Sequence, residues 1–256
     1  MTAPLRLRGL VSLLFVLLVW EGISRLGIVP ARYFPGLTEI FAGAVEMIRN
    51  GELPAAELMT LGRAIAGLVL ATLIGIALAV LSDASPFFER GFRTITGLVQ
   101  PIPPAAIVPL AIFGFGLGLK LYIFIIVMVT IWGPYLNGVT ALRAVPVEQI
   151  LNGRMMRMTP AQIMWHIKLP AAMPQIFAGI RYAAAVSLIA VVVSEMIAGR
   201  DGIGYLLVRK SFSIRIPETY ALMFVTMING VLLAALVNLG RRVLTGWHVK
   251  QMGYPA

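Results

Sequence analysis

The sequence predicts an all-α integral membrane protein with six transmembrane helices, and three observations lead to this prediction. Hydrophobic residues make up 59% of the 256 residues, and the mean hydropathy is +0.89. Charged residues account for 12%, about half of the usual share. Six apolar stretches are long enough to cross a bilayer. Because a soluble domain of this length has too little interior to bury so much apolar surface, we expect one transmembrane domain over residues 1–256.

The predicted spans must each cross roughly 30 Å of hydrocarbon. They cover residues 10–27, 58–82, 97–117, 121–142, 174–198 and 220–243. A cleavable signal peptide is the alternative for the first one, since Arg6 and Arg8 precede a short apolar core and Val29-Pro30-Ala31 resembles a cleavage site. Trp20 and Glu21 within that core favour a retained span.

The net charge of +10 divides unevenly if the spans alternate from a cytoplasmic N-terminus. The cytoplasmic side then carries three acids against twelve basic residues, which are Arg6, Arg8, Arg90, Arg93, Arg143, Arg154, Arg157, Lys168, Arg181, Arg241, Arg242 and Lys250. Cytoplasmic loops of membrane proteins carry such an excess. Both termini are therefore predicted to be cytoplasmic, and the basic charge requires no nucleic acid partner.

Enzyme and metal chemistry find no support in the sequence. With no cysteine and two histidines far apart, His166 and His248, we predict neither a metal centre nor thiol chemistry. The sequence has no phosphate-binding Gly-Lys loop, no His-Glu-x-x-His and no convincing set of Ser, His and Asp. We expect no cofactor bound by this chain, so a transporting chain must take its energy from an ion gradient or from a partner.

Two segments have structural interpretations. After Pro35-Gly36, apolar residues recur at helical spacing from Leu37 to Ile48, which predicts a short amphipathic helix on the outer surface. In the second span, a close approach of helix backbones is indicated by small residues spaced four apart: Gly67, Ala71, Gly75 and Ala79.

The third span contains four prolines within nine residues: Pro101, Pro103, Pro104 and Pro109. Proline has no N–H and its ring clashes with the preceding turn, so a regular helix is excluded. Backbone left unpaired at membrane depth persists only in a protein interior or beside a water-filled cavity. We expect Pro101, Pro103 and Pro104 to line a translocation path; a kink that serves packing is the alternative.

Residues 143–173 form a cytoplasmic connection with two predicted helices. Val147–Met156 is compatible with a helix, and Thr159-Pro160 is typical of an N-cap followed by proline at the first helical position. The second short helix, Ala161–Ile167, is expected to end at Lys168-Leu169-Pro170.

The same connection carries Arg154 and Arg157. Two short helices that meet at an angle on the cytoplasmic face predict a docking surface. A basic loop that touches anionic lipid headgroups is the alternative.

Polar side chains inside spans are candidates for function. Glu195 lies near the outer end of the fifth span, where it acts either in the path or as a structural group that reaches water or pairs with Arg200. Asn229 in the sixth span either contacts the path or, like Asn238, hydrogen-bonds across helices.

Several motifs together resemble the permeases of ABC importers, in particular the nitrate/sulfonate/taurine/bicarbonate branch. In the cytoplasmic connection these are Val147-Glu148, Thr159, Ile163, Ile167, Leu169-Pro170-Ala171-Ala172-Met173-Pro174 and Gly179. Elsewhere they are Arg63, Pro101–Pro104, Gly114–Gly118, Glu195, Gly202-Ile203-Gly204-Tyr205-Leu206, Arg241-Arg242 and Trp247.

This resemblance implies a type I ABC importer permease in a bacterial inner membrane. Two such subunits would form the path for a small, anionic solute, two cytoplasmic ATPases would hold ATP and Mg, and an outside substrate-binding protein would deliver the solute. A coupling helix at about Thr159–His166 would enter a groove on the ATPase. The residues implied in coupling are Asn152, Gly153, Arg154, Met156, Arg157, Thr159, Pro160, Ile163 and His166.

The sequence departs from the family pattern within this loop. Leu151, Asn152 and Gly153 stand where the family has Glu-Ala-Ala, and Arg157 stands where it has Gly. The second permease is therefore expected to be either the same chain or a different, more typical one. A secondary carrier driven by an ion gradient is the alternative function, and a purely structural membrane subunit is a third.

Overall fold

The computed structural model describes residues 3–30 and 32–251, with side chains for residue 9, residues 11–30 and residues 32–243. The described backbone is helical throughout its regular elements, with twelve α-helices and one π-helical segment, Met164–Lys168. The α-helices are α1 (Ala3–Arg25), α2 (Leu37–Arg49), α3 (Glu52–Ala84), α4 (Pro86–Val99), α5 (Pro104–Phe115), α6 (Leu119–Thr130), α7 (Trp132–Arg143), α8 (Val147–Met155), α9 (Pro160–Ile163), α10 (Leu169–Ala198), α11 (Ile203–Phe212) and α12 (Ile216–Gln251).

Four helical stretches among the described residues are long and apolar enough to cross a membrane, and they contain four of the six predicted spans. They are Glu52–Ala84, Leu119–Arg143, Pro160–Ala198 and Ile216–Val243. The bent pair α4–α5 makes a fifth. The first predicted span falls largely in α1, a helix of 23 residues, but the count of six stays a prediction. The side chains of Arg6, Arg8, Trp247, His248 and Lys250, and the cleavage-site residue Ala31, lie outside the described residues.

The start predicted for the third span, residue 97, is wrong, whereas the break that its prolines predicted is confirmed. The apolar pair begins at Pro86, and α4 and α5 are bent by 104° at the connection that holds Pro101 and Pro103. Pro103 is extended, with φ −62° and ψ 138°, and α5 begins at the next proline. The prolines break the helix because they cannot donate the hydrogen bonds that would continue it.

The predicted end of the second short cytoplasmic helix at Lys168-Leu169-Pro170 is also wrong. α9 continues through Met164–Lys168 into α10, so that one helical stretch covers Pro160–Ala198. The N–H of Leu169 bonds to the carbonyl of Met164, five residues earlier. The wider π turn accommodates Pro170, whose ring would otherwise clash with the carbonyl one turn before it.

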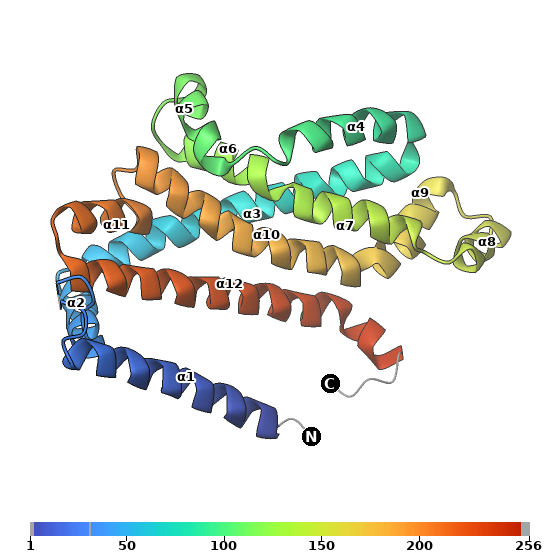
Figure 1. The fold of residues 1–256 in the computed structure, drawn as a ribbon. Helices are drawn as coiled ribbons and strands as arrows, with labels where there is room; N and C mark the ends of the chain where they lie inside the picture. The colour runs from blue at the N-terminus through green and yellow to red at the C-terminus, as the bar shows by residue number, and fades with distance from the viewer. Residues whose placement is uncertain (1–2, 31, 252–256) are drawn as a thin grey trace.

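The helices cross the molecule lengthwise between two ends (Figure 1). α8 and α9 lie at one end, whereas α2 and α11 lie at the other. α1 runs toward the end that holds α2, and α12 runs away from that end, so the start of α1 and the last turns of α12 both lie away from α2 and α11. This is the topology that six alternating crossings would produce, and the orientation of the two ends relative to a membrane remains a prediction.

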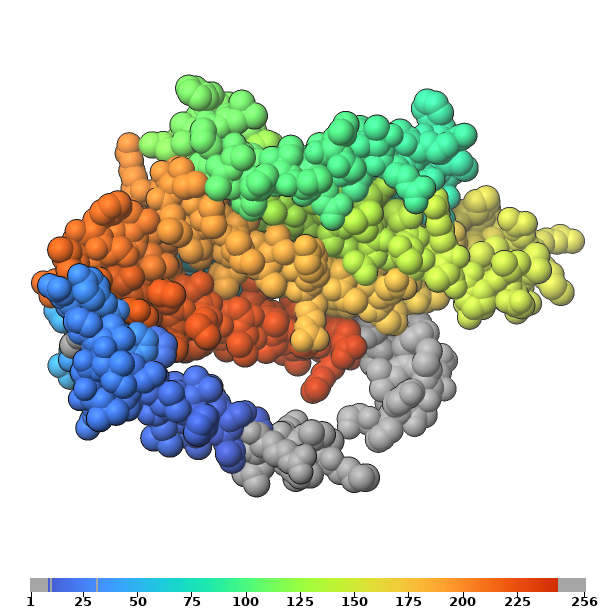
Figure 2. All heavy atoms as spheres, in the orientation of Figure 1, coloured from blue at the N-terminus to red at the C-terminus, as the bar shows by residue number. Residues whose placement is uncertain are grey.

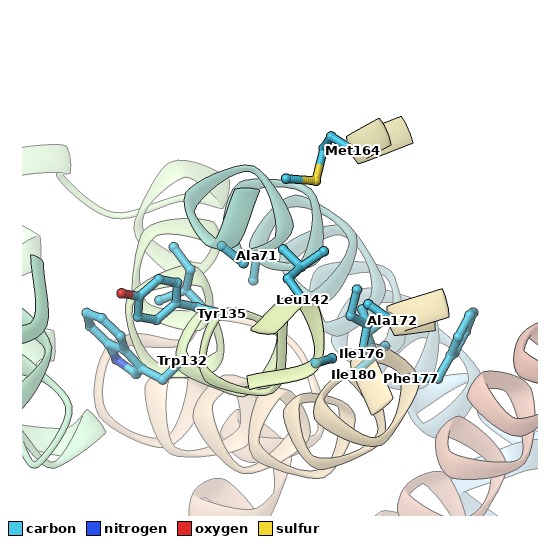
Figure 3. Close-up of a cluster of buried hydrophobic side chains, with 12 residues drawn as sticks. Ala71, Trp132, Tyr135, Leu142, Met164, Ala172, Ile176, Phe177 and Ile180 are labelled. Carbon is cyan, nitrogen blue, oxygen red and sulfur yellow. The ribbon is translucent and has the colours of Figure 1, made fainter. Parts of the chain in front are cut away.

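The core lies where α3, α7 and α10 meet (Figure 3). Trp132, Tyr135, Leu142 and Ile176 pack there with Ala71 and other buried apolar side chains. The backbones come close enough that a Cβ added at Gly179 would overlap the carbonyl of Gly133. The predicted close approach of small residues is confirmed in α3, since a Cβ at Gly138 would lie 2.7 Å from that of Ala79.

α1 joins the rest of the molecule through its C-terminal turns. The ring of Trp20 stacks on Phe34 at 4.3 Å between centroids, and its Nε1 donates to the carbonyl of Pro35 at 3.1 Å. Glu21 Oε2 accepts a hydrogen bond of 2.7 Å from the N–H of Leu37, at the start of α2. The predicted amphipathic helix at 37–48 is confirmed as α2, it is joined to the C-terminal turns of α1, and its place on the outer surface stays a prediction.

Large apolar side chains cover much of the remaining surface. α4 and α5 form one long edge of the molecule in Figure 2, and their exposed residues include Phe87, Leu98, Leu110 and Phe113. Such a surface is unfavourable in water and fits a chain whose solvent is lipid or an apolar partner.

Candidate functional site

The α8–α9 connection is locally built by a capping box. Thr159 Oγ1 accepts from the N–H of Gln162 at 3.3 Å, and Gln162 Oε1 accepts from the N–H of Thr159 at 2.8 Å. Pro160 occupies the first helical position, where a missing N–H has no cost. The N-cap predicted at Thr159-Pro160 is confirmed, so the exposed start of α9 is held in one conformation.

Arg157 forms the turn between α8 and α9 with a left-handed backbone, at φ +58°. The N–H of Arg157 donates to the carbonyl of Arg154 at 2.9 Å, and the N–H of Met158 donates to that of Gly153 at 3.1 Å. Glycine is favoured at such a position because a Cβ is strained there. Glycine, which the family resemblance implies at this position, would adopt this backbone without strain, and Arg157 is a strained residue there.

Gly153 and Ile163 hold the two short helices together from inside. Ile163 is 6% exposed, and a Cβ added at Gly153 would lie 2.6 Å from Cδ1 of Ile167 and 3.3 Å from Cγ1 of Ile163. A small residue is therefore required at position 153. Both residues therefore position α8 against α9.

The other predicted coupling residues are exposed: Asn152, Arg154, Met156, Arg157, Thr159, Pro160 and His166. Sequence reasoning missed Met155, which is 81% exposed, and Trp165, which is 61% exposed. Two apolar side chains in a basic, polar connection were the signal that could have identified them. Together these residues make a mixed basic and apolar surface, which is the composition typical of docking sites.

A groove of about 590 Å³ lies between this connection and the end of α3. Arg154 and Trp165 line it, and so does the ion pair of Lys168 with Asp83. This ion pair ties the start of α10 to the end of α3. The α8–α9 connection is therefore attached to two of the long helices that form the core.

The prolines predicted to line a path lie on the surface of this chain. Pro101 and Pro103 are exposed in the α4–α5 connection, and Pro104 is half-buried. An apolar hollow of about 540 Å³ follows them, lined by Ile102 of the connection and by residues of α5 and α6 that include Phe124. A role of these prolines in a path stays a prediction.

Glu195 is completely buried at the end of the molecule opposite the α8–α9 connection. Its Oε1 accepts from Nη1 of Arg63 at 2.7 Å. Its Oε2 accepts from Oγ1 of Thr60 at 2.8 Å and from the N–H of Gly204 at 3.1 Å. The suggested contacts of Glu195 with water or with Arg200 are wrong. Arg63 of α3 lies close enough to form an ion pair with the Glu195 carboxylate, and this pair takes the place of those contacts.

Arg63 has a second acidic partner and an aromatic one. Its Nη2 donates to Oδ1 of Asp201 at 2.5 Å, and its guanidinium lies 4.1 Å from the centroid of the Tyr122 ring. The Tyr122 hydroxyl donates to the carbonyl of Ala198 at 3.4 Å. One arginine therefore joins α3, α6, α10 and the connection to α11.

The carboxylate of Glu195 determines which residues fit in the Gly202–Gly204 turn. Gly202 has φ +93°, and a Cβ there would overlap the carboxylate of Glu195. A Cβ at Gly204 would lie 2.7 Å from that of Glu195. The N–H of Ile203 donates to Oγ1 of Thr60 at 2.8 Å. These contacts give the glycines of the Gly-Ile-Gly motif a physical reason, since any larger residue would displace Glu195.

Sequence reasoning did not assign Thr60, Tyr122 and Asp201 to a site, and it noted Arg63 only within the family pattern. The signal for Arg63 was a single arginine inside an apolar span, which requires an acidic partner.

Asn229 joins α12 to α3. It is buried, and its Nδ2 donates to Oε2 of Glu57 at 3.0 Å. This is the interhelical hydrogen bond that the sequence offered as one interpretation. The contact of Asn229 with a path stays a prediction.

An ion-pair cluster lies beside α11. Lys210 Nζ lies 2.7 Å from Oε2 of Glu52 and 2.6 Å from Oε2 of Glu218. Burial alone would lower the pKa of Lys210, but the contacts with Glu218 and Glu52 outweigh it and raise this pKa above its usual value. The cluster ties α3, α11 and α12 together at one point.

Comparisons with known proteins agree on one family. The sequence profile described as "Binding-protein-dependent transport system inner membrane component" matches residues 71–252. The putative aliphatic sulfonates transport permease protein SsuC of Bacillus subtilis is 25% identical over 242 residues, which cover 94% of this chain and 88% of that protein. The nitrate import permease protein NrtB of Synechocystis is 30% identical over 174 residues, 68% of this chain and 63% of that one.

Solved structures share the fold. A chain of the inward-facing MetNI methionine ABC transporter superposes with a TM-score of 0.58 at 19% identity, covering 73% of this chain and 91% of that one. A chain of an amino acid ABC transporter with histidines superposes with a TM-score of 0.63 at 16% identity, covering 77% and 97%. The predicted fold class, a type I ABC importer permease, is confirmed.

Replacing Glu195 with glutamine should lower the thermal stability of the purified protein strongly. The change leaves Arg63 buried beside a neutral amide, and loss of one partner of a buried ion pair costs about 3 kcal/mol or more. Asp201→Asn is the matched control, because it removes the same charge from the same arginine at a half-exposed side chain. It should cost about 1 kcal/mol or less. Equal losses of unfolding temperature in the two variants would contradict the conclusion that Glu195 is the more important partner of Arg63.

Replacing Arg157 with glycine should raise the stability of the protein by about 1 kcal/mol, because glycine adopts the left-handed turn without strain. Arg157→Ala removes the same charge and keeps the Cβ, so it should be neutral or slightly destabilising. Thermal unfolding of the three proteins side by side checks this. A gain with alanine as large as with glycine would assign the effect to charge and contradict the backbone argument.

Proposed function

Since the chain belongs to the family of binding-protein-dependent transport system inner membrane components, we propose that it forms half of the membrane path of an ATP-driven importer for a small oxyanion. The observation that carries this proposal is the family match over residues 71–252. The oxyanion is supported by the names of the relatives, which are permeases for sulfonates, nitrate and bicarbonate.

The α8–α9 connection is the proposed docking site for a separate cytoplasmic ATPase, which would hold ATP and Mg. Its support is the exposed surface of Arg154, Met155, Met156 and Trp165, beside a groove of about 590 Å³. The opposite end, with α2 and α11, would face outward and receive the substrate-binding protein. Both termini would then be cytoplasmic.

A second permease completes the path in this proposal. It would cover the apolar edge of α4 and α5, and Pro101, Pro103 and Pro104 would lie on the path between the two chains. The departures from the family pattern at Leu151–Gly153 and Arg157 support a partner that is a different chain, and a second copy of this chain is the other arrangement.

Coupling would run along one helical rod. Pro160–Ala198 connects the docking end directly with Glu195 at the other end. A change in ATPase binding that tilts α9 would therefore move α10, and the ion pair Arg63–Glu195 would pass that movement to α3 and α11. ATP and delivered solute would then bias two conformations of the same path, one open outward and one open inward.

The transport proposal is tested with the chain reconstituted in proteoliposomes together with its ATPase and binding protein. Nitrate, methanesulfonate and bicarbonate are offered in turn, and one of them should accumulate only when ATP reaches the ATPase. Accumulation should persist with a proton ionophore. Uptake by the purified chain alone, abolished by the ionophore, would instead establish a carrier driven by an ion gradient.

Two variants separate positioning from surface contact in the same assay. Ile163→Asp places a charge in the buried joint between α8 and α9, so uptake should fall far more than with Arg154→Ala at the exposed rim.

The orientation is tested by single cysteines in this cysteine-free chain. Asn50 and Thr159 are both exposed and lie at opposite ends of the molecule. On intact cells, a membrane-impermeant thiol reagent should label Asn50→Cys and leave Thr159→Cys unlabelled until the cells are opened. Labelling of Thr159→Cys from outside would reverse the proposed orientation.

A further inference from the structure

A small cavity of about 280 Å³ lies between α4 and α7, apart from the groove at α9. Arg143 is the last residue of α7, and α8 begins four residues later at Val147, so the cavity belongs to the α8–α9 end of the molecule. Its polar lining consists of Glu89, Arg93, Thr96, Tyr135, Thr140 and Arg143.

The cavity wall is electropositive. Nη1 of Arg143 donates to Oε1 of Glu89 at 3.1 Å. Arg93 lies one helical turn beyond Glu89 on α4, and within the described part of the chain it makes no ion pair. Two guanidinium groups therefore face the space, and one carboxylate partly neutralises them.

The size and chemistry of the cavity select a small oxyanion. A water molecule takes about 30 Å³ in the liquid, and sites for drug-sized ligands occupy roughly 300–1,000 Å³. A volume of about 280 Å³ thus fits an ion of a few atoms with part of its hydration shell. The planar donor fork of arginine matches two oxygens of such an ion. Tyr135 and Thr96 are buried, so one side of the site is shielded from water, which strengthens the attraction.

We propose that Arg93 and Arg143 form an oxyanion site at the cytoplasmic end of the α4–α5 pair, where the transported ion is held before release. This inference rests on the proposed function for the nature of the ion. Glu89 competes with the ion for Arg143, and this competition keeps binding weak enough for the ion to leave.

The test measures thermal unfolding of the purified permease–ATPase complex while sodium nitrate replaces sodium chloride at constant ionic strength. A bound ligand raises the unfolding temperature by mass action. The nitrate concentration that gives half of this rise therefore reports the affinity of each variant, measured relative to the unfolding temperature of the same variant in chloride. Methanesulfonate and bicarbonate are tested in the same way. Arg93→Gln and Arg143→Gln should each raise this concentration about tenfold, the usual effect of losing one charged hydrogen bond.

Glu89→Gln should change the half-effect nitrate concentration in the opposite direction. Removing the competing carboxylate frees Arg143, so the half-effect concentration should fall severalfold. If the Glu89–Arg143 pair served structure alone, the Glu89 and Arg143 variants would shift stability in the same direction and leave nitrate dependence unchanged. Arg90→Gln is the control, because Arg90 lies on the same helix, donates to the carbonyl of Pro86 and does not line the cavity.

The inference is overturned if none of the three anions raises the unfolding temperature, or if the Arg93, Arg143 and Arg90 variants respond alike. The proposed function fails separately, in the uptake assay. Oxyanion binding that depends on Arg93 and Arg143, in a complex without ATP-driven uptake, would uphold the site and reject the importer.

Discussion

The ion pair between Arg63 and Glu195 is the contact on which the end of the molecule opposite α8 and α9 depends. It places a full charge of each sign inside the protein, where neither is tolerated without the other. Thr60, the N–H of Gly204 and the ring of Tyr122 complete the surroundings of the pair. Because these groups come from α3, α6, α10 and α11, none of the four helices can move far without exposing a charge to an apolar environment.

The packing of α7 against α3 and α10 is of another kind. There the packing is apolar and backbone-close, with Gly133 against Gly179 and Gly138 against Ala79. Glycines at these contacts give van der Waals packing, which replaces the hydrophobic effect between helices in lipid. The Arg63–Glu195 contact is ionic, whereas the Gly133–Gly179 and Gly138–Ala79 contacts depend on the absence of larger side chains.

The fold was predictable from the sequence where the signal is local. Long apolar runs predicted most of the membrane helices, and Thr159-Pro160 predicted the start of α9. The partner of Glu195 was not predictable in this way, because Arg63 lies 132 residues earlier in the chain. The first half of the bent span was missed because Glu89, Arg90 and Arg93 interrupt its hydropathy. Pro170 misled for the opposite reason, since a strong local signal to end the helix is overridden by packing of the Ala172 and Ile176 side chains in the core.

The π-helical segment Met164–Lys168 determines how α9 is rotated about the helix axis relative to α10. Successive residues of an α-helix are rotated by about 100° about the helix axis. The π turn contains one extra residue, so the residues before it are rotated by about that angle relative to the residues after it, compared with a regular helix. The side chains of α9 are therefore aimed by the length of this segment as much as by their own identity. Loss of one residue here would restore a regular helix and turn the exposed side of α9 toward a different neighbour, while α10 kept its position in the core. The number of residues in this turn is therefore more strictly constrained than their identity. Natural variation should conserve the spacing between Thr159 and Ala172 even where the residues between them change.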